Sequence, residues 1–281
     1  MKNESFESVS ALCSPGPWPR GSLFLGLYFP VGLLLLVSRI AMLLLFYGLS
    51  PVVPKFLKKT LYRVQVFSLG IKIRCKWTEE EIRMHTQGCV VAANHVSAMD
   101  AFFALALPNA TIMVGNPISS LNLFGRICYA SAFDFSGAKF WFISERRALV
   151  KHLKSWRDNP AGTTLYTTPE MTINNQRGIF KFNTAFVCLD MPVVPLAITV
   201  RNCFDMQLQP VKSSNFMIFV RILMLPGIVF NLDYLGKTAR FAGESKECFA
   251  KRIQTSIANH LGVPATEWTA ADKHAYRKAI A

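Results

Sequence analysis

A histidine and an aspartate five residues apart are the clearest candidates for chemistry in this sequence. His95 and Asp100 follow the apolar run CVVAA, which ends at Ala93 and is typical of a buried strand. On a regular helix a five-residue step separates two side chains by about 140°, so His95 must lie in the turn before a helix. With Ser97 as the N-cap residue, the Asp100 carboxylate could reach back to one imidazole nitrogen while the other faces a cleft.

The pair has a functional and a structural interpretation. In the functional one, the Asp100 carboxylate fixes the tautomer and stabilises the imidazolium, so His95 acts as a general base. Such catalysis is worth about 10² to 10⁴ in rate. In the structural one, Ser97 and Asp100 only cap the helix, and His95 is a satisfied loop residue. The pair alone does not decide between them.

The elements that would position this pair alternate along the chain. From Cys89 onward, short β-rich runs are separated by longer mixed segments, which is typical of an α/β domain. In such folds functional residues lie on loops at the ends of strands. The β-rich runs are CVVAAN, TIMVG, FWFIS, TTLYTT and PVVPLAITV, and the mixed segments include SAMDAFFALAL and RALVKHLKSW.

Two helices are predicted near the end of the sequence. A short one starts at Thr269, because Asp272 stands at the third position after this N-cap residue. A longer amphipathic one has apolar residues at every fourth position, Phe249, Ile253, Ile257 and Leu261. Residues 216–230 form a separate apolar stretch, interrupted by Arg221 and Pro226. We expect a buried strand and turn there, or a second membrane-touching surface.

Further motifs follow the pair in an order that resembles the four blocks of the glycerolipid (PlsC-type) acyltransferase family. The first block is similar at Asn94, His95 and Asp100, the second loosely at Ile143, Glu145 and Arg146 with Ser144 intervening, the third at Pro169, Glu170 and Thr172, and the fourth at residues 192–195. The ordered set is far more specific than any one motif. The resemblance implies a mixed sheet flanked by helices and a histidine base acting on an acceptor hydroxyl, which attacks an acyl-CoA thioester.

The resemblance also implies the site residues. His95 and Asp100 would be catalytic. The substrate-binding residues would be Asn94, Arg146, Pro169, Glu170 and Thr172. Arg177 is a further candidate, as a replacement for an arginine that this sequence lacks. No bound cofactor and no metal site are expected, and acyl-CoA would be the co-substrate of an active enzyme.

Two departures fall in the third block. Met171 stands where the family has glycine, and a side chain there obstructs a phosphate that approaches the backbone. Ile173 stands where the family commonly has arginine, so a bidentate phosphate clamp is lost. Arg177 or Lys181 could replace that arginine. An intact base beside an altered phosphate-reading block suggests a different acceptor or a site that no longer turns over.

Composition excludes other classes of protein. The 281 residues include 31 Lys and Arg against 17 Asp and Glu, a formal charge of +14, and 51% are apolar. Such a chain is neither disordered nor collagen-like. A nucleic acid is not expected as a partner, because zinc-finger spacing and an RNP-type aromatic strand are both missing.

The cysteines predict neither a disulfide framework nor a zinc site. Their number is odd, their spacing is wide, and no C-x-x-C motif occurs. Free thiols in a reducing compartment are the simpler interpretation. The seven are Cys13, Cys75, Cys89, Cys128, Cys188, Cys203 and Cys248.

A long apolar segment predicts a membrane anchor. Residues 23–49 would form a helix of about 40 Å, whereas the hydrocarbon core needs about 30 Å. Pro30 and Arg39 interrupt the segment, so we favour a bent hairpin in one leaflet over a single span. A cleaved signal peptide is the third alternative, but Glu4 and Glu7 precede the segment and no small-x-small cleavage site follows it.

The basic residues that follow place this flank on the cytosolic side. Seven lysines and arginines lie between Lys55 and Lys76, with no acidic residue before Glu79. Interleaved apolar residues suggest an amphipathic segment on anionic lipid, and an ordinary solvated basic helix is the alternative. The predicted organisation is a cytosolic tail (1–22), a membrane hairpin (23–49), a basic membrane-surface segment (50–86), an acyltransferase-like domain (87–235) and a C-terminal helical segment (236–281).

A closer resemblance covers nearly the whole chain. Its features are an apolar N-terminal segment with an internal Pro-x-Gly, a basic stretch, the altered P-E block followed by NN and RG, and the motif TAADK at 269–273. They resemble a family of monotopic hairpin proteins with an acyltransferase-like domain, at the cytosolic face of the endoplasmic reticulum membrane and on lipid droplets. The resemblance implies a membrane adaptor in lipid-droplet regulation, lipid metabolism and ER-associated degradation (ERAD).

The partners implied are membrane lipid, the lipid-droplet monolayer and proteins of the ubiquitin pathway. In that family a ubiquitin-binding CUE domain and a segment that recruits a ubiquitin-conjugating enzyme lie downstream of the acyltransferase-like part. Those modules lie beyond this chain, so their functions cannot be assigned to any of its residues. An active lysophospholipid or glycerol-phosphate acyltransferase that uses His95 and Asp100 is the alternative function.

Overall fold

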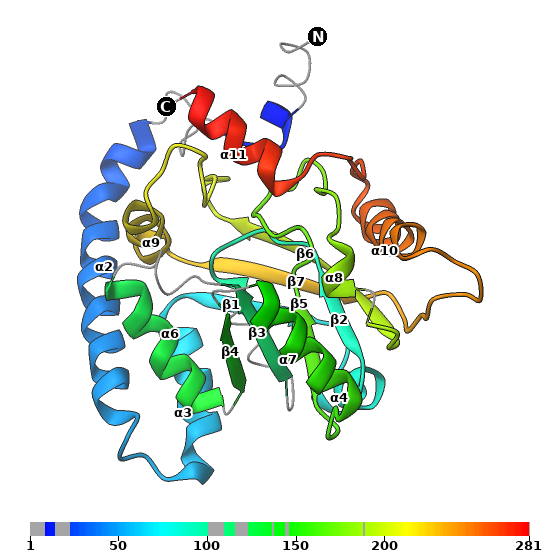
Figure 1. Cartoon of the computed structure of the whole chain (residues 1–281). Helices are drawn as coiled ribbons and strands as arrows, with labels where there is room; N and C mark the ends of the chain where they lie inside the picture. Colours follow the sequence, from blue (N-terminus) through cyan, green and yellow to red (C-terminus); the bar gives the residue numbers. More distant parts are fainter. Residues whose placement is uncertain are drawn as a thin grey trace.

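A mixed sheet forms the centre of the molecule (Figure 1). The computed structural model describes residues 9–14, 23–100, 110–115, 123–136, 138–143, 146–187 and 189–280. Its seven-stranded sheet has the order β1-β7-β6-β2-β5-β3-β4, and only β6 and β7 are antiparallel neighbours. The strands are β1 (Ile71–Cys75), β2 (Val90–Ala93), β3 (Ala110–Gly115), β4 (Lys139–Ile143), β5 (Thr164–Thr167), β6 (Val193–Asn202) and β7 (Ile228–Tyr234). The predicted α/β fold with a mixed sheet is confirmed.

The strands that precede the candidate site lie at the centre of the sheet. Every residue of β2 is buried, and β2 pairs in parallel with β5 on one side and β6 on the other. Parallel strands covered on both faces have continuous apolar sequences, which explains the run CVVAA. His95 therefore follows the carboxyl end of a central strand.

Helices cover the sheet and its edges (Figure 1). Their bounds are α2 (Leu23–Leu49), α3 (Lys55–Ser68), α4 (Glu79–Thr86), α6 (Leu123–Ser136), α7 (Arg146–Asp158), α8 (Thr184–Val187), α9 (Asn215–Met224), α10 (Lys246–Leu261) and α11 (Ala270–Ala279). Both predicted C-terminal helices are confirmed. In α10, Phe249, Ile253 and Ile257 are buried, and α11 begins with a capping box between Thr269 and Asp272.

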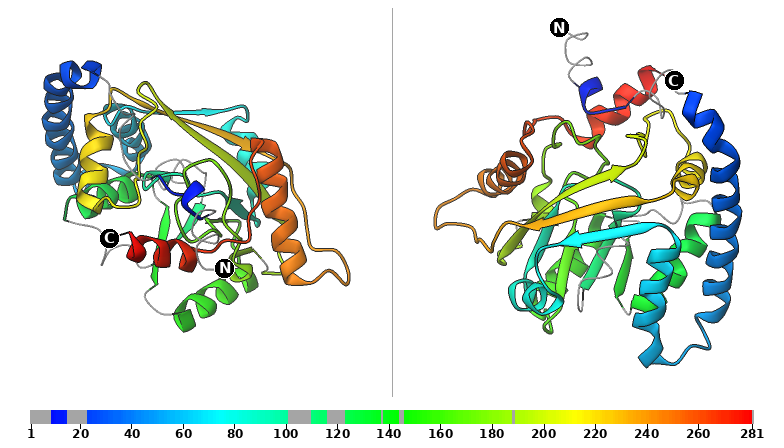
Figure 2. Two further views of the ribbon diagram at one scale, coloured as in Figure 1. Left: turned by 90° about the horizontal axis from the view of Figure 1, so that it is seen from above. Right: turned by 180° about the vertical axis from the view of Figure 1, so that it is seen from behind.

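The long apolar segment is one continuous helix, α2, with Pro30 in its interior. A proline removes one backbone donor, and here the helix continues through it. The chain reverses direction after α2, and α3 returns beside it, so the two form a helical hairpin along one side of the molecule (Figure 2). Gly26–Leu49 is long and apolar enough to cross a membrane by length and composition.

One charged side chain attaches α2 to the rest of the molecule. Arg39 is 5% exposed, and its guanidinium donates hydrogen bonds to the backbone oxygens of Ser68 (3.2 Å), Leu223 (2.9 Å) and Pro226 (3.0 Å), and also to that of Leu225. These oxygens lie at the ends of α3 and α9. Arg39 therefore joins three helices, and its charged group is buried among them.

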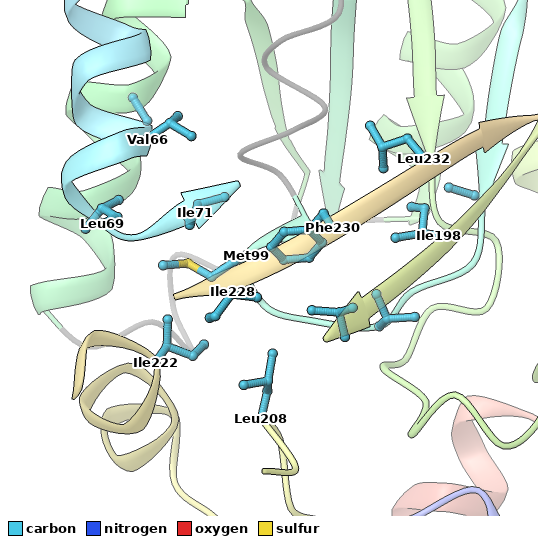
Figure 3. Close-up of a cluster of buried hydrophobic side chains, with 14 of the residues drawn as sticks. Val66, Leu69, Ile71, Met99, Ile198, Leu208, Ile222, Ile228, Phe230 and Leu232 are labelled. Atoms are coloured by element: carbon cyan, nitrogen blue, oxygen red, sulfur yellow. The ribbon is translucent and has the colours of Figure 1, made fainter. Parts of the chain in front are cut away.

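The predicted segment 50–86 does not form one surface unit. It is divided into α3, strand β1 of the central sheet, and α4. Val66 of α3 and Ile71 of β1 share a buried cluster with Met99, Ile222 of α9 and Phe230 of β7 (Figure 3). Only α3 within this segment is therefore a candidate for a membrane-surface helix.

The apolar stretch 216–230 also differs from the expected strand and turn. Most of it belongs to helix α9, and β7 begins at Ile228. Ser214 caps α9 by accepting a hydrogen bond from the Met217 amide (3.3 Å). Apolar residues on several faces of a short helix give little periodicity, so pattern alone did not separate helix from strand.

Candidate active site

The side chains of His95 and Asp100 meet as the spacing predicted. The Nδ1 atom of His95 lies 2.8 Å from Oδ2 of Asp100, and the same oxygen accepts a hydrogen bond from the Val96 amide at 2.8 Å. Asp100 is buried, whereas the His95 side chain is 23% exposed. This geometry orients the imidazole and leaves Nε2 as the ring nitrogen that could accept a proton.

The turn between them favours the functional interpretation of the pair. The Ser97 hydroxyl accepts a hydrogen bond from the Met99 amide (3.1 Å), and the helix begins at Asp100. The Asp100 carboxylate points back to His95 and Val96, so it does more than cap its own helix. Residues 101–109 lie outside the described residues.

The buried side chain of Glu170 holds the His95 loop through backbone hydrogen bonds. Its Oε1 accepts hydrogen bonds from the His95 amide (2.7 Å) and the Asn174 side chain (2.8 Å), and its Oε2 accepts one from the Phe180 amide (2.8 Å). Burial raises the pKa of Glu170, and the hydrogen bonds from Asn174, His95 and Phe180 oppose this shift. Glu170 is 1% exposed, so its carboxylate acts within the protein as a positioning group for the His95 loop.

Asn94 attaches the same loop to strand β6. Its side chain donates to the backbone oxygen of Ile198 (2.9 Å) and accepts from the Ile198 amide (2.8 Å). Asn94 thus extends the pairing of β2 with β6 beyond the end of β2. Because it is 1% exposed, its amide is used within the protein rather than presented to a ligand.

The third block lies in a tight turn beside the loop. Pro169 is buried and Thr172 is partly exposed. Met171 has φ +58° and a 47% exposed side chain, and its amide donates to the Thr168 oxygen at 3.0 Å. Left-handed backbone favours glycine, so the glycine of the resembled family has a conformational reason besides close approach of a phosphate.

Two basic residues of the prediction, Arg177 and Lys181, lie at the surface. Arg177 is exposed, and Lys181 forms a surface ion pair with Glu267 at 3.0 Å. Arg146 is the first residue of α7, but its side chain lies outside the described part of the chain, as do Ser144 and Glu145.

One cation beside the site was missed by the sequence reasoning. Lys273 of α11 donates a hydrogen bond to the backbone oxygen of Ile173, one hundred residues earlier in the chain. A cavity of about 130 Å³ is lined by Lys273 and Ile173 and reaches Val96, the neighbour of His95. The TAADK motif contains Lys273, but nothing in its local pattern indicates this long-range contact.

Comparison with known proteins agrees with this fold. Residues 74–199 match the Acyltransferase family model. The fold is similar to the crystal structure of the 1-acyl-sn-glycerophosphate (LPA) acyltransferase PlsC from Thermotoga maritima, with a TM-score of 0.55 and 14% identity over 84% of this chain and 96% of that chain. Residues 74–199 are therefore similar to the Acyltransferase family, and the chain has the fold of the PlsC structure.

The wider similarity identifies particular relatives. The "Lipid droplet-regulating VLDL assembly factor AUP1" of Xenopus laevis is 29% identical over 99% of this chain and 67% of its own length, and that of Homo sapiens is 27% identical over 91% and 60%. A zebrafish "Glycerol-3-phosphate acyltransferase 3" is 26% identical over 74% of this chain and 46% of its own. The chain thus has homologues named AUP1, ancient ubiquitous protein 1, over nearly its whole length, and the closer resemblance seen in the sequence is confirmed.

The match to these homologues does not reach their full length. The chain spans 59% to 67% of the AUP1 proteins from frog, zebrafish, rodents and human. The match alone therefore does not assign the activities, substrates or partners of those whole proteins to this chain.

Proposed function

We propose that this chain is a membrane adaptor that regulates lipid droplets, built on an acyltransferase-like domain at the cytosolic face of the endoplasmic reticulum and of the droplet monolayer. The observation that carries the proposal is the long apolar helix α2, docked along the domain beside the basic amphipathic helix α3. The name of the AUP1 relatives supports it. A role in ER-associated degradation follows only from the resemblance, as do partners of the ubiquitin pathway.

The outer surface of the hairpin has the composition of a lipid-binding face. On α3, Phe56 and Phe67 are 79% and 82% exposed, and lysines lie between them. Aromatic and aliphatic side chains beside lysines suit an anionic lipid surface. The exposed apolar residues of α2 are Leu27, Phe29, Val31, Leu33, Leu34, Val37, Leu44, Leu45, Tyr47 and Leu49.

The test keeps the fold intact and changes only the lipid-facing surface. Leu34→Ser, Phe56→Ser and Phe67→Ser are combined in one chain, and Met84→Ser on α4 is the control because its side chain is also exposed (60%). We expect the triple variant to leave droplets for the cytosol and to lose its effect on droplet number. His95→Ala should keep both properties. Droplet targeting that is unchanged in the triple variant would contradict the proposal.

The intact pair favours acyl transfer as a second function. His95 Nε2 would take the proton of an acceptor hydroxyl, whose oxygen attacks the thioester carbon of acyl-CoA. Collapse of the intermediate expels the CoA thiolate, which receives the proton from the imidazolium. Asp100, 2.8 Å from Nδ1, would stabilise that imidazolium.

Labelled acyl-CoA tests this function in purified, lipid-reconstituted protein with lysophospholipid or glycerol phosphate as acceptor. Acyl transfer should fall by at least about 10² in His95→Ala, and strongly in Asp100→Asn. His152→Ala on α7, an exposed histidine, should retain activity. Equal activity of His95→Ala and the unaltered chain would exclude His95 as the base.

A further inference from the structure

A small cavity lies beside the His95 loop, on the side of Val96. Its volume is about 130 Å³, whereas a water molecule needs about 10 to 15 Å³ on this measure. Parts of the chain that are distant in sequence supply its walls: residues 12–14, the loop 173–176, the end of β6, the loop 205–211 and α11. The cavity therefore has room for a small ligand and exists only in the folded chain.

Part of the wall is fixed by internal hydrogen bonds. The Gln176 side chain bonds both backbone polar groups of Val200, at 2.7 and 3.0 Å. The Asn202 side chain bonds the backbone of Met206 through both of its polar atoms, at 2.8 and 3.0 Å. A wall with satisfied amides keeps its shape whether or not the cavity is filled.

Lys273 offers the cavity hydrogen-bond donors. Its ammonium has three N–H groups, of which one is used on the Ile173 oxygen within the described part of the chain. The remaining N–H groups can bind an acceptor.

The charge around the cavity is positive on balance. Lys273 and Arg201 line it, and Arg277 lies near enough to lower the pKa of Lys273, although burial is the larger cause. Asp205 is an opposing carboxylate on the exposed rim. Glu170 is a second acidic residue near Lys273, and its side-chain oxygens already accept hydrogen bonds from His95, Asn174 and Phe180.

We propose that this cavity binds a phosphate group, with Lys273 as its cation. Phosphate monoesters and inorganic phosphate carry only acceptors and negative charge at neutral pH, which complements this set of groups. The site is distinct from the catalytic pair, because Val96 rather than His95 lines it.

The phosphate site is connected to the His95 loop by short contacts. The Asn174 amide donates to the His95 oxygen at 2.8 Å, and Lys273 holds the oxygen of the preceding residue, Ile173. A ligand on Lys273 would therefore stabilise the backbone that supports His95. This inference concerns a second site and does not depend on lipid-droplet regulation or acyl transfer.

Calorimetric titration with inorganic phosphate tests the site in the purified full chain. We expect saturable binding that Lys273→Met weakens by about tenfold to a hundredfold, the effect of losing one hydrogen bond to a charged group. Lys278→Met is the matched control, because Lys278 is an exposed lysine on the same helix. It should bind as the unaltered chain does, and Lys273→Arg should bind more tightly than Lys273→Met.

The melting temperature of Lys273→Met, measured beside its phosphate binding, separates loss of the site from loss of folding. Hydrogen exchange should slow at residues 173–176 when phosphate binds. Vesicles of phosphatidylcholine with and without phosphatidate then show whether a lipid monoester competes with free phosphate.

Three results would overturn the proposal. They are absence of saturable phosphate binding, equal binding by Lys273→Met and the unaltered chain, and phosphatidate binding that depends equally on Lys278. The last result would indicate general adsorption by a basic surface instead of a built site.

Discussion

The guanidinium of Arg39 occupies the space that a β-carbon on residue 70 would fill. Gly70 has φ +72°, and an added Cβ would collide with the Arg39 Nη2 atom and lie 2.9 Å from the Pro226 oxygen. A glycine in the turn after α3 therefore makes room for the charged group that holds α2. The same arginine bonds the carbonyl oxygens at the end of α9.

Replacing Arg39 should destabilise the folded chain. Arg39→Leu leaves several buried carbonyl oxygens without donors, so we expect a loss of about 2 to 4 kcal/mol in the free energy of unfolding. Arg39→Lys keeps the charge but not the planar set of donors, so it should lose less unfolding free energy than Arg39→Leu. Urea unfolding in detergent measures both, and Lys72→Leu at an exposed position of β1 should change stability by about 0.5 kcal/mol or less. Equal stability of Arg39→Leu and the control would contradict this role.

Gly70→Ala should lower the free energy of unfolding by more than the left-handed backbone strain explains, because the added β-carbon would also collide with Arg39. Gly236→Ala is the matched control, because Gly236 has φ +90° and open space around it. The control should lose about 1 to 2 kcal/mol of unfolding free energy, and Gly70→Ala should lose more than the control. In an Arg39→Leu background the excess should shrink, and a double-mutant cycle measures this coupling. Additive effects would show that the two residues do not interact.

The docking of α2 predicts the membrane topology. Arg39 and the Tyr28 hydroxyl, which donates to the Met224 oxygen at 2.7 Å, hold α2 against α9. A helix held to the domain along its length would leave both ends of the chain on the same side of the membrane. Tags at each end should therefore both be digested by protease added to intact microsomes. Protection of one tag would indicate a single span.

Met171→Gly should stabilise the chain. The left-handed conformation costs a residue with a side chain about 1 to 2 kcal/mol, and glycine loses more entropy on folding by about 0.5 to 1 kcal/mol. We therefore expect a net gain of about 0.5 to 1 kcal/mol in thermal or urea unfolding. Met84→Gly, in the right-handed helix α4, should instead lose about 1 kcal/mol. Destabilisation in both variants would contradict the prediction.

Glu170→Gln should move the His95 loop. The groups around the two carboxylate oxygens are all N–H donors, so the NH₂ of glutamine would face another donor. We expect a loss of about 1 to 3 kcal/mol in unfolding free energy and faster hydrogen exchange at the His95 amide. Glu247→Gln, on the surface of α10, should change stability by about 0.5 kcal/mol or less. Unchanged exchange at His95 would show that Glu170 does not position the loop.

The contacts that the sequence predicted correctly are local. His95 and Asp100 are five positions apart in a strand-turn-helix unit, so the turn alone limits where the two side chains can lie. The α10 and α11 helices followed from apolar periodicity and from the capping pair Thr269 and Asp272, which act within one or two helical turns. For the same reason the central strand before His95 was recognised from its continuous apolar run.

The tertiary structure alone decided the contacts between distant segments. Lys273 reaches Ile173 because α11 packs over the His95 loop, and Arg39 satisfies the ends of α3 and α9 because three helices meet there. The left-handed conformation of Met171 and the buried role of Glu170 likewise depend on the loop they support. Local patterns carry no information on such contacts, since they form only when packing brings remote parts of the chain together.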